Sequence, residues 1–420
     1  MAITVAAQAA PPDALTTTGR SVSNLIEDLG DKEFCVREQA SQMLRRLGRR
    51  SLPSLRAAAN HCDFEVRHRA NLVRMEVEKA EATGATLVTL PRSPLRISDA
   101  FELLSKQTGY RFDVAKATAS DELFEFNINQ ASFWSSLDSI CNAGGFGLWS
   151  IEDGTIRLVK RQSPPDFVFR NGAFRVSAEG VQDTRTIRFT ADKLPEARSD
   201  SLDLTLSLHS EPKLAILELG SPTITEAIDD HRHSMIDPDE CGRHEAKVRS
   251  GMPTLRYYRL PTLLRLRRRA NSTRIERIRG IIPVRVLQND LAEAEISDLR
   301  HASGSTMLTS AGQLTFEEMS RTSDQHSRAY TVRLSLKRPA GSRDSRDWCT
   351  SVEQRLALEG ARGERWPIQD VEWLHRGQDE AELRLIAEST SDEPPQKLRF
   401  TSWNSFEYPL EFEFRGVPLP

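Results

Sequence analysis

The chain has 420 residues, a formal net charge of −3 at pH 7 and a mean hydropathy of −0.48. This length predicts two to four domains at roughly 100–200 residues each. The charge balance excludes a chain-wide cationic field for nucleic acid, and no apolar run approaches the roughly 18 residues of a membrane helix. The cysteines are dispersed without Cys-x-x-Cys spacing, which excludes a dense disulfide scaffold. They are Cys35, Cys62, Cys141, Cys241 and Cys349.

The first residues, MAITVAAQAAPPDA, leave two interpretations open. We expect residues 1–20 to be either a disordered tail or the remnant of a signal peptide whose true start lies upstream of Met1. Ala7-Gln8-Ala9 is typical of a small-residue cleavage site, but no basic segment precedes it.

Residues 21–84 show helical periodicity and an internal repeat. Val36-Arg37-x-x-Ala40 returns thirty residues later as Val66-Arg67-x-x-Ala70. Repeats of this length indicate stacked helical hairpins, and we expect each arginine to bond across the turn between repeats. The buried faces are predicted to carry Val22, Leu25, Leu29, Val36, Ala40, Met43, Leu47, Leu52, Leu55, Ala59, Val66, Ala70, Val73 and Val77. The unit resembles a short HEAT-type repeat, with DKEFCVREQASQML as its best copy.

Residues 85–162 alternate between strand and helix patterns. A strand from Leu87 to Leu90 is followed by a helix with an apolar stripe, which Gly109 ends. After strands near residues 110–114 and 123–128, a second striped helix runs to Gly144-Gly145. A hairpin is predicted across Asp153-Gly154. The pattern predicts one small βαββαβ sheet that carries two helices.

This segment resembles the short N-terminal (STN-like) domain of secretins and TonB-dependent transducers. The stretches SPLRISDAFELLSKQTGYRF and ASFWSSLDSICNAGGFGLW carry the resemblance. It implies protein–protein contact in a bacterial cell envelope. No downstream stretch is similar to the membrane domain of either family, so pore formation is not implied.

From residue 166 onward, short alternating segments replace helical periodicity. Ser163-Pro164-Pro165 is typical of a linker, and turns recur about every ten residues. We predict two antiparallel β-sandwich-like domains, at 166–290 and 293–420, with a boundary near Asp290 to Glu293. The predicted fold class is multidomain α+β: helical HEAT-like hairpins, a small βαββαβ domain and two β-sandwich-like domains.

The densest polar cluster lies between Asp229 and Glu245. Its residue types are ones that bind transition metals, although the spacing matches no metalloprotease motif and is typical of a solvated loop. A metal-dependent hydrolase there is the second alternative function. The candidate ligands are His231, His233, Asp237, Asp239, Glu240, Cys241 and His244.

A second cluster is basic and has two interpretations. Alternation along a strand predicts a charged outer face, whereas an anion or nucleic-acid patch would need stacking aromatics, and only Tyr257 and Tyr258 lie nearby. The cluster contains Arg265, Arg267, Arg268, Arg269, Arg274, Arg277 and Arg279.

Tryptophans give further candidates for contact. We expect Phe133 in the core and Trp134 partly exposed, with Trp134 and Trp149 available to a partner. Trp348, Trp366, Trp373 and Trp403 are either core residues or a sugar platform. Ser210-Glu211-Pro212-Lys213 matches Ser-x-x-Lys, but it lacks the companion motifs of an acylating serine.

These patterns predict a non-enzymatic, modular protein of the cell envelope that binds a protein partner. We assign no catalytic residue, metal ligand or cofactor, and expect neither a nucleic-acid partner nor a transmembrane segment. The first alternative is a carbohydrate-binding or polysaccharide-acting protein that contacts glycan through its last β domain. The expected location is the periplasm or outside the cell, with the cytoplasm as the alternative.

Overall fold

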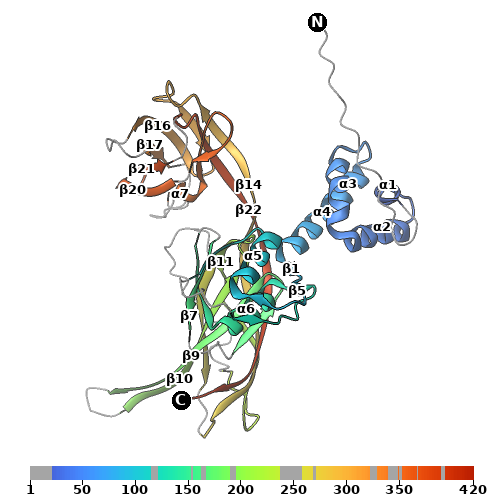
Figure 1. Ribbon diagram of the computed structural model, residues 1–420, viewed down its shortest axis with the longest axis vertical. Coiled ribbons are helices and arrows are strands. Elements are labelled where there is room, and N and C mark those ends of the chain that lie inside the picture. The colour runs from blue at the N-terminus through green and yellow to red at the C-terminus, as the bar shows by residue number, and fades with distance from the viewer. Residues whose placement is uncertain are drawn as a thin grey trace. The chain divides into compact units, whose positions relative to one another are not determined.

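The computed structural model describes residues 21–114, 122–152, 155–161, 167–189, 195–236, 258–267, 271–321, 329–338, 349, 352–366, 368–388 and 393–420. The chain has a mixed α+β architecture with several antiparallel sheets (Figure 1). It divides into two compact units, Met1–Gly84 and Ala85–Pro420. The predicted tail 1–20, the turn residues 153–154 and the linker residues 163–165 lie outside the described residues.

Four α-helices form the N-terminal unit: α1 (Val22–Asp28), α2 (Phe34–Leu47), α3 (Leu52–Ala57) and α4 (Phe64–Thr83). Short 3₁₀ helices at Gly48–Ser51 and Ala58–Asn60 flank α3. The second one tightens the chain, so Ala58 is buried and the predicted core residue Ala59 is exposed. The core of the unit consists of Val22, Leu25, Ile26, Leu29, Ala40, Leu44, Leu52, Leu55, Ala58, Val66, Ala70, Val73 and Val77.

The repeated arginines donate their hydrogen bonds to turns within their own repeats and not across the turn between repeats as predicted, although Arg37 Nε also lies 3.6 Å from Glu65 of the second repeat. Arg37 Nη1 donates to the carbonyls of Asp31 and Lys32, at 2.8 and 3.1 Å. Arg67 Nη1 donates in the same way to His61 and Cys62, at 2.5 and 2.9 Å. Each arginine therefore satisfies carbonyls of the turn that leads into its own helix.

Two helices of the central segment follow the prediction closely. They are α5 (Ile97–Thr108) and α6 (Phe133–Gly144). Gly109 and Gly145 end them in the left-handed conformation, with φ of 74° and 68°. This conformation costs a residue with a Cβ about 1 kcal/mol, which explains the glycines.

The prediction of one sheet in this segment is wrong, because its strands form three sheets. β1 (Leu87–Val88) pairs with β5 (Ala131–Ser132), and β2 (Leu95–Arg96) pairs with β4 (Leu123–Phe124). The third sheet has the order β3-β7-β6: β3 (Arg111–Val114), β7 (Thr155–Lys160) and β6 (Phe146–Glu152). Phe126 and Ile128 lie in the core but outside any strand, so apolar alternation overestimated the length of β4.

The first large sheet is antiparallel and has the order β13-β10-β9-β8. Its strands are β8 (Val168–Asn171), β9 (Phe174–Phe189), β10 (Pro195–Ser210) and β13 (Arg259–Arg267). A second sheet has the order β11-β14-β22-β18-β19, with β12 also on β14. Its strands are β11 (Ile216–Leu219), β12 (Thr223–Asp229), β14 (Arg274–Ser297), β18 (Leu356–Glu359), β19 (Arg365–Trp366) and β22 (Lys397–Pro418).

The third large sheet comes from the last third of the chain and has the order β15-β16-β17-β21-β20. Its strands are β15 (Thr306–Thr309), β16 (Gly312–Arg321), β17 (Ala329–Lys337), β20 (Ile368–Arg376) and β21 (Glu380–Glu388). The short helix α7 (Val352–Arg355) precedes β18.

No interruption of secondary structure marks the boundary predicted near Asp290 to Glu293, which falls inside β14. β14 has 24 residues and pairs with the 22-residue β22 from Arg274↔Pro418 to Ser297↔Lys397 (Figure 1). Pro283 faces Pro409 within this ladder, and the Pro283 carbonyl accepts a bond from Gly220 N on the other side. The two prolines thus form a pair of opposed residues that exchange no hydrogen bonds between β14 and β22. A missing N–H costs nothing in the ladder there, so neither proline breaks its strand.

Glu211, directly after β10, joins the central α+β segment to the first large sheet. Its side chain is fully buried and accepts bonds from Thr86 N at 3.0 Å, Thr86 Oγ1 at 2.5 Å and Tyr110 Oη at 2.8 Å. Burial, and then the Glu211 carboxylate, raise the pKa of the Tyr110 phenol, which keeps it a donor. Because Thr86 and Tyr110 belong to the α+β segment, one buried charge holds two parts of the fold together.

Replacing Glu211 by glutamine should destabilise this second unit. The neutral amide of glutamine cannot replace a carboxylate that accepts three hydrogen bonds. We therefore expect a loss of about 2–4 kcal/mol in the free energy of unfolding. Urea denaturation followed by circular dichroism measures it. Glu218→Gln is the control, because Glu218 pairs with Arg285 at the surface and should cost at most about 1 kcal/mol. Equal losses in the two variants would contradict the role of Glu211.

Candidate functional site

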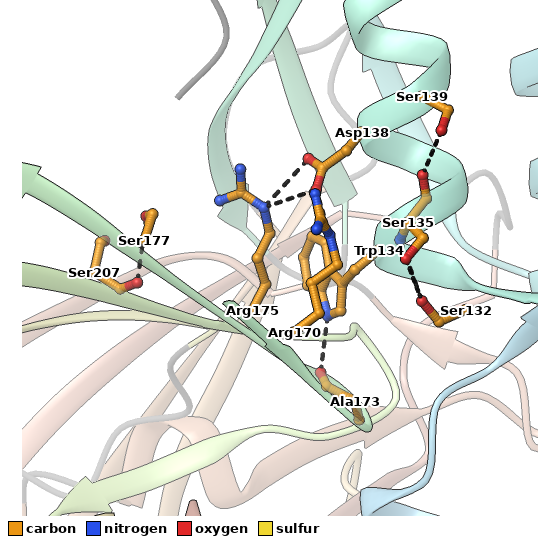
Figure 2. A network of polar contacts seen from close by, with 10 residues as sticks. All are labelled: Ser132, Trp134, Ser135, Asp138, Ser139, Arg170, Ala173, Arg175, Ser177 and Ser207. Carbon is orange, nitrogen blue, oxygen red and sulfur yellow. Dashed lines mark hydrogen bonds and ion pairs between the residues drawn. The ribbon is translucent and has the colours of Figure 1, made fainter. Parts of the chain in front are cut away.

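Helix α6 contacts the first large sheet through a polar network at its N-terminal half (Figure 2). Asp138 accepts from Arg170 Nε at 2.7 Å and from Arg175 Nε at 3.3 Å. Arg175 is only 4% exposed, so its charge depends on this carboxylate for compensation. In Figure 2 the rest of the Arg175 guanidinium points away from Asp138.

Trp134 is fully buried, which corrects the prediction that it is partly exposed. Its indole Nε1 donates to the carbonyl of Ala173 at 3.0 Å (Figure 2). Its ring also meets the ring of Phe133 edge-on. The sequence showed an aromatic residue beside the apolar stripe of α6, but not that a sheet far along the chain covers this side. Trp134 is therefore a contact within the chain and cannot reach an outside partner.

His209, a residue of β10, lies beside Trp134 and is 4% exposed. Burial, and then the charges of Arg175 and Arg259, lower the pKa of the imidazole to about 3. The ring is therefore neutral at pH 7. Among the residues that the structure describes, its Nδ1 is buried and finds no hydrogen-bond partner.

A pair of exposed phenylalanines is the most distinctive surface feature of the N-terminal unit. Phe34 and Phe64 are the first residues of α2 and α4, and they are 63% and 70% exposed. They occupy equivalent places in the two repeats. The repeated Val-Arg pair and alanine did not single out these phenylalanines, although each one precedes its Val-Arg pair by two positions.

Guanidinium groups lie over both exposed rings. Arg37 Cζ lies 5.6 Å and Arg69 Cζ 5.9 Å from the centroid of Phe34, and Arg67 Cζ lies 5.7 Å from that of Phe64. Cation–π contacts of this kind hold a ring in place without covering it. The unit thus presents two oriented aromatic rings to the solvent.

Only part of the predicted metal cluster lies within the described residues. Asp229, Asp230 and His231 place ligand atoms within 4.8 Å of one another, whereas Asp237, Asp239, Glu240, Cys241 and His244 lie outside the described residues. Asp229 accepts from His231 N, His233 N and Ser272 Oγ, at 2.9, 2.7 and 2.6 Å. These bonds close the turn after β12 and tie it to the start of β14.

The basic cluster is largely paired with carboxylates. Arg265 meets Asp203 at 3.0 Å, Arg274 meets Glu276 at 3.0 Å, and Arg277 and Arg279 both contact Glu226. Arg268 and Arg269 lie outside the described residues. Arg267 is exposed, and no ion pair of it occurs among the described residues. The described part of this cluster is therefore a mostly ion-paired, charged face, as the strand alternation indicated.

The described tryptophans of the last β region, Trp366, Trp373 and Trp403, are buried or half-buried and do not form one exposed surface. Trp366 is 2% exposed and packs on Tyr330, and Trp373 is partly buried with its Nε1 bonded to Glu353 at 3.0 Å. Trp348 lies outside the described residues. Trp149, by contrast, is 62% exposed. The serine of the Ser-x-x-Lys match is fully buried, and its lysine contacts Glu211 at 3.6 Å.

The cysteines that the structure describes are free thiols: Cys35 and Cys62 are exposed, and Cys141 and Cys349 are buried. Burial, followed by the charge of Asp138, raises the pKa of Cys141 to about 12. Cys141 is therefore a small apolar core residue of α6.

None of the helices in the described part of the chain combines the length and the apolar character that a membrane crossing requires. Comparisons with protein-family models, with curated proteins and with solved structures gave no match to this chain. Function must therefore be argued from the residues themselves.

Replacing Asp138 by asparagine should weaken the contact between α6 and the first large sheet. The buried Arg175 then lacks its countercharge, and we expect a loss of about 3 kcal/mol in the free energy of unfolding. Chemical denaturation measures this loss. Glu372→Gln, which removes the exposed pair with Arg384, is the control and should change stability by less than about 1 kcal/mol. A small loss in both variants would refute the role of Asp138.

The low pKa of His209 predicts acid sensitivity. Between about pH 6.5 and about pH 3 the unfolded chain binds a proton on this ring that the folded chain does not bind. Stability should therefore fall as pH falls through this window, by up to roughly 1 kcal/mol per pH unit from this residue. His209→Phe should flatten the curve between pH 6.5 and 5, measured by urea denaturation at several pH values. Parallel curves of stability against pH for the natural chain and the His209→Phe variant would contradict this role of His209.

Proposed function

We propose that this chain is a non-enzymatic, modular interaction protein of a bacterial cell envelope. In this proposal the N-terminal helices are HEAT-like repeats that bind a protein partner. Residues 85–162 are a secretin-like small domain, and the β regions are sandwich-like scaffold domains. The envelope location rests on the resemblance of the central segment to envelope machinery.

The observation that carries the proposal is the exposure of Phe34 and Phe64 at equivalent positions of the repeat. A phenylalanine that leaves most of its surface in water contributes little to the stability of its own helix. Aromatic residues are enriched where interfaces derive most of their binding energy. Two such rings, one contacted by two guanidinium groups and the other by one, are suited to insertion into apolar pockets of a partner.

The charges around the rings indicate what the partner surface offers. Arg67 donates to backbone carbonyls and stays cationic, while Arg37 and Arg69 share Glu65 at 3.6 and 2.6 Å. Three guanidinium groups thus lie near the two rings. A partner with apolar pockets and an acidic rim complements this surface.

The central segment contributes to this function as a connector. Its helix α6 directs Trp134 and Asp138 into the first large sheet, so this side of the helix is already occupied within the chain. This argues for the N-terminal unit, in place of the central module, as the main docking surface. Trp149 remains as an exposed aromatic residue of that module.

Replacing both Phe34 and Phe64 by serine in the full chain tests the proposal. Removing two interface aromatics should weaken partner binding by roughly 100-fold or more, at about 1–3 kcal/mol per ring. Purified full-length protein serves as bait in envelope fractions of the source organism, and the affinity of each captured protein is then measured with purified components.

The matched control is Leu72→Ser combined with Met75→Ser, because these exposed residues, at 46% and 50%, lie on α4 away from its first turn. The control should keep the affinity of the natural chain. Binding that survives the loss of both phenylalanines, or that falls equally in the control, would overturn the assignment of this surface.

A further inference from the structure

Four basic residues form a row across the first large sheet. Arg170 on β8 pairs in register with Arg175 on β9, Arg175 pairs with His209 on β10, and His209 pairs with Arg259 on β13. Directly opposed residues of an antiparallel sheet project from the same face. Three guanidinium groups and one imidazole therefore lie side by side.

Such a row is costly because like charges that face each other across strands repel. Asp138 compensates Arg170 and Arg175, and Glu179 pairs with Arg259 at 3.1 Å. Two carboxylates thus face three guanidinium groups. His209 stays neutral between two of them, which limits the repulsion but leaves the row with an excess of positive charge.

A cavity of about 940 Å³ opens on this row. Arg175, His209 and Arg259 line it, together with Arg161 from the end of the central segment. Cavities of roughly 300–1,000 Å³ accommodate small organic ligands. The remaining wall is mixed: Leu148, Phe167, Val181, Leu204, Val417 and Leu419 give it an apolar part, and Ser177 and Glu179 are among its polar residues.

Several polar atoms at the cavity wall have unused bonding capacity. Arg175 donates through Nε to Asp138, and no partner of its Nη groups occurs among the described residues. An oxyanion in the cavity would supply acceptors for these N–H groups, which donate charge-assisted hydrogen bonds.

We propose that this cavity binds a small amphiphilic anion, with its oxyanion head at the row formed by Arg175, His209 and Arg259 and its apolar body along the opposite wall. The head is a carboxylate or a phosphate monoester. Arg175 and Arg259 supply charge-assisted N–H donors, and neutral His209 lies between them in the row. The excess positive charge of the row is then compensated, and the apolar part of the wall is covered.

Isothermal titration calorimetry of the full chain tests this proposal with four probes: decanoate, decyl phosphate, inorganic phosphate and the uncharged octyl glucoside. Decanoate or decyl phosphate should bind saturably at one site, and the stronger of the two identifies the head group. Inorganic phosphate and octyl glucoside should bind at least about tenfold more weakly, because each offers only one half of the required contacts.

Substitutions test whether these probes bind in this cavity. Arg259→Gln should lower the affinity about tenfold, because it removes one charged donor. Arg265→Gln is matched to it: Arg265 lies on the same strand, is 47% exposed against 44% for Arg259, and also pairs with one carboxylate, but it does not line the cavity. Arg265→Gln should leave the affinity unchanged. Arg161→Gln, at an exposed position, gives a second test that does not disturb the sheet.

Two results would overturn the proposal. One is the absence of saturable binding of both decanoate and decyl phosphate to the natural chain. The other is equal affinity of the Arg259→Gln and Arg265→Gln variants when both retain the circular dichroism spectrum and melting temperature of the natural chain.

Discussion

The second unit of this protein depends on one buried carboxylate. Glu211 cannot remain charged and fully buried unless Thr86 and Tyr110 supply donors, and these residues lie more than a hundred positions earlier in the chain. The central α+β segment must therefore remain packed against the first large sheet whenever the second unit is folded. Asp138 and Trp134 extend the same contact from α6, so three polar anchors act along one junction.

The junction also explains why a basic cavity lies next to it. Asp138 compensates Arg170 and Arg175, and this permits a sheet that places arginines at neighbouring positions of successive strands. The compensation is incomplete where the row continues to His209 and Arg259. A structural contact and a proposed ligand site thus share Arg175, which bonds to α6 through one nitrogen and leaves the others for the cavity.

Most aromatic residues of the two units are used in opposite ways, although Trp149 of the second unit is also exposed. In the second unit Trp134 and Phe133 are fully buried, and the core of the central segment is rich in edge-on aromatic contacts. In the N-terminal unit Phe34 and Phe64 remain in water, while the core is built from aliphatic residues and alanine. This contrast is the reason to assign scaffolding to the second unit and partner binding to the first.

The sequence by itself determined the local elements: the repeated helices with their Val-Arg pair, the helices that end at Gly109 and Gly145, and the hairpin of β6 and β7. These features depend on periodicity and on backbone preferences within about a dozen residues. Only the tertiary structure decided the burial of Trp134, the continuity of β14 through Pro283, the role of Glu211 and the row from Arg170 to Arg259. Each of these requires a partner distant in sequence, and periodicity along one segment carries no information about strand register or about which surface another segment will cover.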